Sequence, residues 1–183
     1  PRRQLRGRAR SPSRRHAVLP VLRVRAAAAA GVVLVIDGRG GHLALAGEMF
    51  ALEAHRKKLG GIIVDGMVRD SAAMQDIDLP VYARAVHPVA GTIQTIGDVG
   101  IAVSCGGIVV NPGDVVFADA DGIVCGAEDE LSALVHGAQN IMANETKAFA
   151  GFKRGTGLMD MLNFEEHYAK RAAGEDSDLT YIL

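Results

Sequence analysis

The chain has 183 residues, of which 49% are hydrophobic and only 4% aromatic, with no Trp. This length suits one domain with a core of Val, Ile, Leu and Ala, and no apolar run approaches the roughly 18 residues of a membrane span. Two cysteines, Cys105 and Cys125, are too few for a disulfide framework, so we expect reduced core residues and a cytoplasmic protein.

The formal net charge of −1 hides an uneven distribution. Residues 1–30 contain nine Arg and no acid, whereas the other 153 residues carry 11 basic and 21 acidic side chains, a net charge of −10. An Arg-rich start is typical of a nucleic-acid arm or a transit peptide, but we favour a disordered or vestigial extension. Because the sequence starts with Pro1 and not Met, we also expect an incomplete or altered product. The acidic remainder argues against nucleic acid as the main ligand. We expect one domain over residues 31–183.

The first half of this domain alternates between strands and helices. The apolar pattern predicts strands at residues 32–36, 62–64 and 81–83, and helices at residues 46–59 and 70–77. A glycine-rich loop follows the first strand at residues 37–42, and Asp65-Gly66 is predicted to be the turn that ends the second strand. This order indicates an α/β fold with parallel strands.

The second half has a different pattern. Short apolar runs at residues 101–104, 108–110, 115–118 and 123–125 are separated by Gly-, Asn- and Asp-rich turns, which predicts a meander of β-strands. A long helix is expected from about residue 128 to residue 153, and a further short apolar segment at residues 159–162 precedes the tail.

The most informative motif is GGIIVDGMVRD at residues 60–70. It places Arg69 and Asp70 at the carboxyl end of a buried strand, where open α/β sheets bind ligands. A fixed cation beside a fixed carboxylate suits an anionic substrate held against a metal ion. Spacing alone leaves a second interpretation equally open, in which the pair is a surface salt bridge and Asp70 caps a helix.

Other residues have ordinary and functional interpretations. The glycine-rich loop at residues 37–42 could hold a phosphate or S-adenosylmethionine, but its spacing is not a full G-x-G-x-x-G and the β-rich second half argues against a doubly wound fold. Glu48 starts the first predicted helix, where the free amides of Met49 and Phe50 could bind a carboxylate. His42 and His87 are candidates for the pocket, although surface or packing roles are commoner.

The motifs together resemble the RraA-like family. The resemblance rests on Gly47-Glu48-Met49 and on residues 60–70, followed in order by PVYAR (residues 80–84), VSCGG (103–107), VNPGD (110–114) and DADGIV (119–124). The family includes 4-hydroxy-4-methyl-2-oxoglutarate / 4-carboxy-4-hydroxy-2-oxoadipate aldolases and the regulator of ribonuclease activity A, and its members are often labelled dimethylmenaquinone methyltransferase. The resemblance covers residues 31–183; the Arg-rich start has no counterpart that we can align.

The resemblance implies a compact α/β/β swivelling-type domain with a mixed sheet and a C-terminal helix. It also implies a homotrimer or hexamer with active sites at subunit interfaces. Arg69 would contact the keto-acid end of a 2-oxo acid substrate, and Asp70 would bind Mg²⁺ or Mn²⁺ directly. Glu48 would hold water on that ion, as would Glu145 from a neighbouring subunit, while Gly47 and the amides of Met49 and Phe50 would hold the pyruvyl carboxylate.

The expected activity is therefore a metal-dependent aldol cleavage that releases pyruvate, with oxaloacetate decarboxylation as a side activity. A divalent ion and Arg69 would stabilise the charge that develops on the keto oxygen, and the lack of Lys in the motif argues against a Schiff base. Two alternatives are a non-catalytic regulator that binds a ribonuclease or RNA helicase and, with less support, a methyltransferase.

Overall fold

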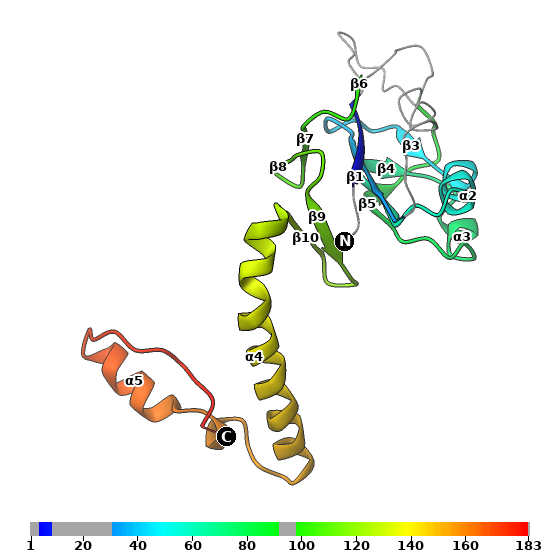
Figure 1. Ribbon diagram of the computed structural model, residues 1–183. Coiled ribbons are helices and arrows are strands. Elements are labelled where there is room, and N and C mark those ends of the chain that lie inside the picture. The colour runs from blue at the N-terminus through cyan, green and yellow to red at the C-terminus, as the bar shows by residue number, and fades with distance from the viewer. Residues whose placement is uncertain (1–3, 9–30, 92–97, 183) are drawn as a thin grey trace. The chain divides into compact units, whose positions relative to one another are not determined.

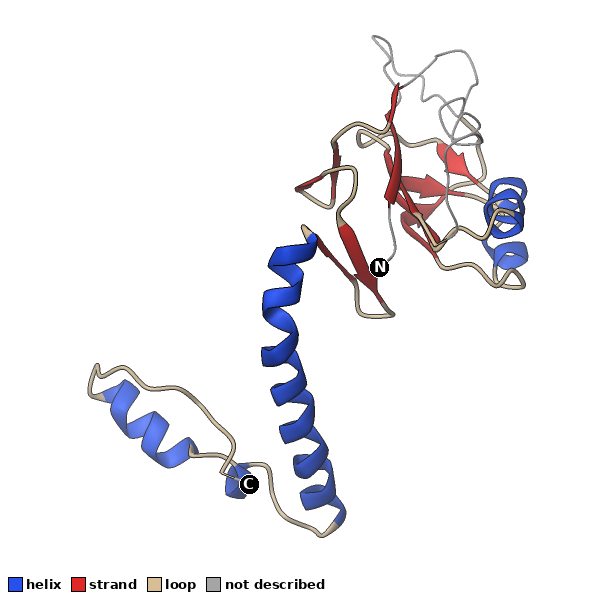
Figure 2. Cartoon of the chain, viewed as in Figure 1, coloured by secondary structure: helices blue, strands red, loops and turns tan. Residues whose placement is uncertain are grey.

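The computed structural model describes residues 4–8, 31–91 and 98–182, which form two units that divide between Leu131 and Ser132 (Figures 1 and 2). Most of the expected Arg-rich extension and residues 92–97 lie outside the described residues.

The first unit is built on a six-stranded mixed sheet. Its strands are β1 (Gln4–Arg8), β2 (Val33–Asp37), β3 (Ala44–Ala46), β4 (Gly61–Val68), β5 (Val81–Val86) and β6 (Asp98–Val99). β4 is central: β2 and then β3 pair with it along one edge, β5 pairs along the other, and all these pairs are parallel. β1 pairs parallel to β2, and β6 pairs antiparallel to β1.

The predicted βαβαβ order is confirmed, with α2 (Glu48–Arg56) between β3 and β4 and α3 (Ser71–Met74) before β5. The predicted helix at residues 46–59 starts too early, because residues 44–46 form β3 and pair with the end of β4. Gly47, whose backbone is extended (φ −159°), separates the strand from the helix. Five residues of the expected extension form β1, which lies between β2 and β6 in the sheet.

The prediction that Asp65-Gly66 ends its strand is wrong. β4 continues to Val68, because its last two residues leave the β2 ladder and pair with β3 instead. The register with β5 also shifts between Val64 and Met67, which marks a β-bulge at Asp65-Gly66. The turn-forming residues therefore bend the strand without ending it.

The core of the first unit consists of two clusters on opposite faces of the sheet, as expected when side chains alternate along a strand. One cluster joins Leu34, Ile62 and Val64 to Ala51 and Ala54 of α2. The other joins the alternate residues Val33, Val35 and Ile63 to the strands that follow the sheet. The core is therefore aliphatic, as the composition predicts.

The expected meander consists of two antiparallel hairpins, β7 (Val103–Cys105) with β8 (Ile108–Val110) and β9 (Val115–Ala118) with β10 (Ile123–Gly126). Val103, Val110 and Val116 cover the second face of the main sheet. Strands therefore occupy the place where a doubly wound fold would have helices. With the C-terminal helix, this confirms the mixed α/β architecture.

The second unit begins within α4 (Glu128–Lys153), whose bounds agree with the prediction. A 3₁₀ turn at Met159–Met161 and α5 (Phe164–Ala172) follow; the sequence predicted the short segment but not α5. Met161 packs against Gly151, where a β-carbon would collide with its sulfur. In residues 4–8, 31–91 and 98–182, no helix is both long and apolar enough to cross a membrane.

Candidate functional site

Arg69 and Asp70 lie directly after β4, at the carboxyl end of the central strand. The Arg69 amide donates to the Ala46 carbonyl at 3.0 Å, which extends the β3–β4 pairing by one residue. The Arg69 Nε atom donates to Asp70 Oδ2 at 3.2 Å, and both side chains are about 40% exposed (39% and 41%). An ion pair this exposed contributes little to stability. Because both side chains are exposed, a ligand can reach them.

The backbone of Asp70 is left-handed (φ 57°, ψ 34°), a conformation that Asp and Asn tolerate better than most residues. Asp70 precedes α3 in the N-cap position, but its side chain makes no cap hydrogen bond there. Asp70 Oδ2 instead accepts a hydrogen bond from the Glu48 amide at 3.3 Å, across 22 residues of sequence. Asp70 therefore has the N-cap position of α3 that the sequence suggested, but its carboxylate does not cap α3. The carboxylate lies at the start of α2 instead.

Gly47 allows this close approach. A β-carbon at position 47 would lie 2.5 Å from Asp70 Oδ2 and 2.8 Å from Arg69 Cγ, closer than real β-carbons come to other atoms. The start of α2 therefore needs glycine because the Arg69–Asp70 pair is packed against it. This contact brings Gly47, Glu48, Arg69 and Asp70 together from two segments of the chain.

The sequence predicted that the amides of Met49 and Phe50 are both free at the start of α2, and the structure differs. The Phe50 amide donates to the Gly47 carbonyl at 3.0 Å, and the Glu48 amide donates to Asp70. Within the described part of the chain the Met49 amide has no hydrogen-bond acceptor, which leaves it as the exposed donor of this turn. The expected carboxylate contact at Phe50 would require the ligand to share or displace its bond to Gly47.

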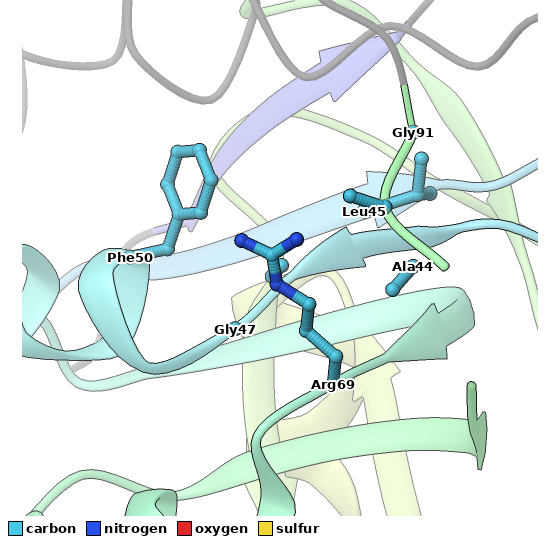
Figure 3. Close-up of a pocket in the computed structure, with 8 residues that line it drawn as sticks. Ala44, Leu45, Gly47, Phe50, Arg69 and Gly91 are labelled. Atoms are coloured by element: carbon cyan, nitrogen blue, oxygen red, sulfur yellow. The ribbon is translucent and has the colours of Figure 1, made fainter. Parts of the chain in front are cut away.

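A pocket of about 150 Å³ adjoins the Arg69 guanidinium (Figure 3). It is lined by Ala44, Leu45, Ala46, Gly47, Phe50, Arg69, Ala90 and Gly91. In Figure 3 the guanidinium extends between the Phe50 ring and the segment at Leu45 and Gly91. Arg69 is the one charged side chain in this lining, so the pocket suits a small molecule with an anionic end and an apolar body.

The sequence did not identify β3 or residues 90–91 as parts of this pocket. The Ala44 amide donates to the Val89 carbonyl, and the Gly91 amide returns to the Ala44 carbonyl, each at 2.9 Å. These bonds hold the segment after β5 against β3. The apolar triplet before Gly47 was the available signal, but it also suits the helix start that we predicted there.

The histidine candidates lie elsewhere. His87 Nδ1 accepts the Val89 amide at 3.2 Å, and its own amide donates to the Val68 carbonyl at 2.8 Å, so His87 shapes the segment that follows β5. His42 is an exposed residue of the glycine-rich loop. Neither lines the pocket at Arg69. Glu145 lies on α4 in the second unit, so its predicted role across a subunit interface stays a prediction.

A divalent ion fits the Asp70 carboxylate only as a largely hydrated ion. The described residues contain no group of three or more His, Cys, Asp or Glu side chains that could hold a metal by themselves. Asp70 Oδ2 accepts two hydrogen bonds, whereas Oδ1 accepts none from the described residues, and the side chain as a whole is 41% exposed. One carboxylate oxygen with room for water and substrate oxygens matches what Mg²⁺ takes in such sites.

A second Arg–Asp pair lies nearby on the strands. Arg84 Nε of β5 donates to Asp65 Oδ1 of β4, and this bond raises the pKa of Arg84. Burial, with a further contribution from Asp65, raises the pKa of the Cys105 thiol to about 11. Cys105 is a free, partly buried cysteine, and its thiol is protonated and weakly nucleophilic at neutral pH.

The chain belongs to the RraA-like family, whose model (Aldolase/RraA) matches residues 7–125. A putative 4-hydroxy-4-methyl-2-oxoglutarate aldolase of Pseudomonas aeruginosa is 44% identical over 96 residues, which are 51% of this chain and 59% of that protein. The chain spans between 58% and 65% of the length of the first curated relatives that it matches.

Two solved structures resemble this one under different functional names. The RNA-processing inhibitor RraA of Thermus thermophilus is 28% identical with a TM-score of 0.59, covering 68% of this chain and 73% of that one. A structure from Geobacillus kaustophilus, described as an S-adenosylmethionine:2-dimethylmenaquinone methyltransferase, is 30% identical with a TM-score of 0.62, covering 72% and 79%. The shared fold is therefore compatible with more than one function. The choice between these functions depends on the residues at the end of β4.

Proposed function

We propose that this protein is a divalent-metal-dependent lyase that cleaves 4-hydroxy-2-oxo acids of the 4-hydroxy-4-methyl-2-oxoglutarate type to release pyruvate, with oxaloacetate decarboxylation as a side activity. The observation that carries the proposal is the convergence of the Arg69 guanidinium, the Asp70 carboxylate and the Met49 amide at one end of β4. The names of several relatives, which are putative aldolases for this substrate, support it.

In this proposal the residues divide the substrate between them. The Met49 amide and the positive end of α2 bind the pyruvyl carboxylate. Arg69 donates to the keto oxygen, where negative charge develops as the C3–C4 bond breaks and its electron pair forms the enolate of pyruvate. The pocket beside Phe50 receives the apolar part of the substrate.

Asp70 would hold Mg²⁺ or Mn²⁺ through Oδ1. When bound, the ion acts as a Lewis acid that adds to the stabilisation of the enolate charge by Arg69. Glu48 is the first residue of α2, and its own amide donates to Asp70. Its carboxylate would hold the water that takes the proton of the C4 hydroxyl group. The same proton, returned to C3, completes pyruvate.

The direct test is pyruvate release from 4-hydroxy-4-methyl-2-oxoglutarate and from oxaloacetate, with Mg²⁺ and after chelation. We expect turnover with Mg²⁺ and loss of it with a chelator, and we expect Arg69→Ala and Asp70→Ala each to abolish it. Full turnover without a divalent ion, or in either variant, would contradict the proposal.

We further propose a homotrimer or a hexamer, in which Glu145 of one subunit reaches the site of another. Large apolar side chains exposed on β8, β9 and β10 support burial in an assembly: Ile108, Val109, Phe117 and Val124 are 50–67% exposed. Light scattering should give three or six times the mass of the chain. A monomer with full activity would contradict both the assembly and the shared site.

The similarity to the Thermus thermophilus inhibitor favours a second candidate, a regulator that binds a ribonuclease or RNA helicase. A regulator does not need the Arg69 and Asp70 side chains. The two functions separate cleanly: inhibition of RNA cleavage that survives Asp70→Ala, with no pyruvate release from the unchanged chain, would replace the lyase proposal.

A further inference from the structure

A β-bulge lies in the central strand four residues before Arg69. Val64 pairs with Ala83 of β5 and Met67 pairs with Ala85, so β4 contains one residue more than β5 over this stretch. Along its other edge β4 changes partner at the same place, from Asp37 of β2 at residue 65 to β3 at Met67. The bulge at Asp65-Gly66 therefore sets the register of the strand end that carries Arg69 and Asp70.

Asp65 is held in the bulge by both its backbone and its side chain. Its carbonyl accepts the Gly38 amide at 3.1 Å, and a β-carbon on Gly38 would collide with that carbonyl. Its carboxylate accepts the Nε hydrogen of Arg84, which lies opposite the bulge on β5. The Asp65 side chain is only 13% exposed, whereas that of Arg84 is 59% exposed and reaches the pair from the outer strand.

Two carboxylates lie side by side at the bulge. Asp37 and Asp65 are register partners on neighbouring parallel strands, and Asp37 is buried, with 7% exposure. Like charges placed side by side on a sheet repel each other. The Arg84 guanidinium offsets this repulsion on the Asp65 side and ties β5 to β4 at the residue where the register changes.

We propose that Asp65 and Arg84 are a positioning pair, which fixes the bulge and thereby directs the Arg69 and Asp70 side chains toward the start of α2. Because side chains alternate between the faces of a strand, a bulge that moved by one residue would turn Arg69 away from Gly47 and the pocket. Arg84 does not itself line the pocket, and in this proposal it acts through β4. The kinetic part of its test rests on the proposed function, whereas the structural part does not.

The test compares Arg84→Met and Arg84→Lys with a matched control, Arg56→Met. Arg56 makes the same kind of pair with Glu53 (Nε to Oε2, 2.7 Å) on the exposed surface of α2, away from the bulge. We expect Arg84→Met to lower kcat by about tenfold or more with a smaller change in KM, as small misplacements of binding groups do. Arg84→Lys should recover most of the rate, and Arg56→Met should leave it unchanged.

Amide hydrogen exchange gives a readout that needs no activity. In Arg84→Met the Arg69 amide, which bonds to Ala46, should exchange at least about tenfold faster, while the Leu34 amide in β2 should not. If Arg84→Met does not fold, Arg84→Gln provides the same comparison with a milder change. Absence of turnover in the unchanged chain would refute the lyase proposal and leave the exchange result to decide the positioning pair.

Wild-type kcat together with unchanged Arg69 exchange in Arg84→Met or Arg84→Gln would overturn the positioning role and make Asp65–Arg84 a surface pair like Arg56–Glu53. A loss of rate in Arg56→Met as large as that in Arg84→Met would also overturn it, because the effect would then be general.

Discussion

Two Arg–Asp pairs lie along the central strand β4, one at its bulge and one directly after its end, and they differ in exposure. At the bulge, Asp65 is mostly buried and its partner Arg84 comes from a neighbouring strand. At the end of the strand, Arg69 and Asp70 are adjacent in sequence, and both are about 40% exposed. The first pair joins strands, whereas the second leaves a carboxylate oxygen and a guanidinium open to solvent. Both pairs join an Arg to an Asp, so chemistry does not distinguish them. The structural contact differs from the candidate site in the burial of its carboxylate and in having its arginine on another strand.

Removing the charge of Asp70 should have the largest effect. Asp70→Asn keeps the side-chain shape and tolerates the left-handed backbone, so the free energy of unfolding should change by less than about 1 kcal/mol. Pyruvate release should fall by about 100-fold or more, because an amide cannot hold the cation as the carboxylate does. The measurements are kcat with Mg²⁺ and thermal unfolding. A variant that kept its activity would place Asp70 with the structural pairs.

Filling the space at Gly47 should have the next largest effect. Gly47→Ala places a methyl group against Asp70 and Arg69, and overpacking of this kind costs about 1–3 kcal/mol. Chemical denaturation would measure the loss. Gly137→Ala in α4 is the matched control, since nothing lies within 4 Å of that position and alanine favours a helix. Equal stability of the two variants would show that the start of α2 can move away from the pair.

The charge of Asp65 should be detectable at Cys105, with a smaller effect. Burial and Asp65 raise the pKa of this thiol to about 11, so Asp65→Asn should lower that pKa and speed alkylation at pH 8, by less than about tenfold. The pH dependence of alkylation in a Cys125→Ser background measures it. No change would mean that Asp65 exerts little field on this face.

The same thiol predicts how stability depends on pH. The pKa of Cys105 is higher in the folded chain than the ordinary value of 9.0, so the folded state retains the proton that the unfolded chain releases. The contribution of Cys105 to stability is therefore complete below pH 9 and declines as pH rises toward 11. Denaturation midpoints of the Cys125→Ser and Cys105→Ser/Cys125→Ser variants, compared between pH 8 and pH 10, should converge at the higher pH.

The smallest effect is expected at Arg56. Its pair with Glu53 joins two residues three apart on one exposed helix face, and such pairs contribute little to stability. Arg56→Met should therefore unfold at the same denaturant concentration as the unchanged chain, as measured by denaturant titration. A clear loss of stability would weaken the distinction between pairs from which the comparison starts.

The sequence predicted the elements whose signals are local. The bounds of α4, β8 and β9 agree with the structure because hydrophobic periodicity and turn residues define them without help from distant segments. The sequence also predicted the ion pair between Arg69 and Asp70, because the two residues are adjacent. The family resemblance, which the family model confirms, supplied the place of the site on the chain.

The elements that depend on distant partners could not be predicted in this way. β3 is a strand only because the end of β4 is free to pair with it, and Asp65-Gly66 bends β4 only because strands continue on both sides. The Glu48 amide meets Asp70 across 22 residues, which no local pattern encodes. α5 was missed although its sequence contains Glu166 and Lys170, which form an ion pair one turn apart.

The left-handed backbone at Asp70 has a consequence for the evolution and design of this site. It restricts the position to the few residues that tolerate such a conformation, and among these only Asp carries a negative charge. Glu would keep the charge but would strain the backbone and extend the carboxylate past the Glu48 amide. A chain that abandoned metal chemistry while keeping this fold would therefore tend toward Asn or Gly at position 70. Under the proposed function, the identity of that one residue would separate catalytic from non-catalytic relatives.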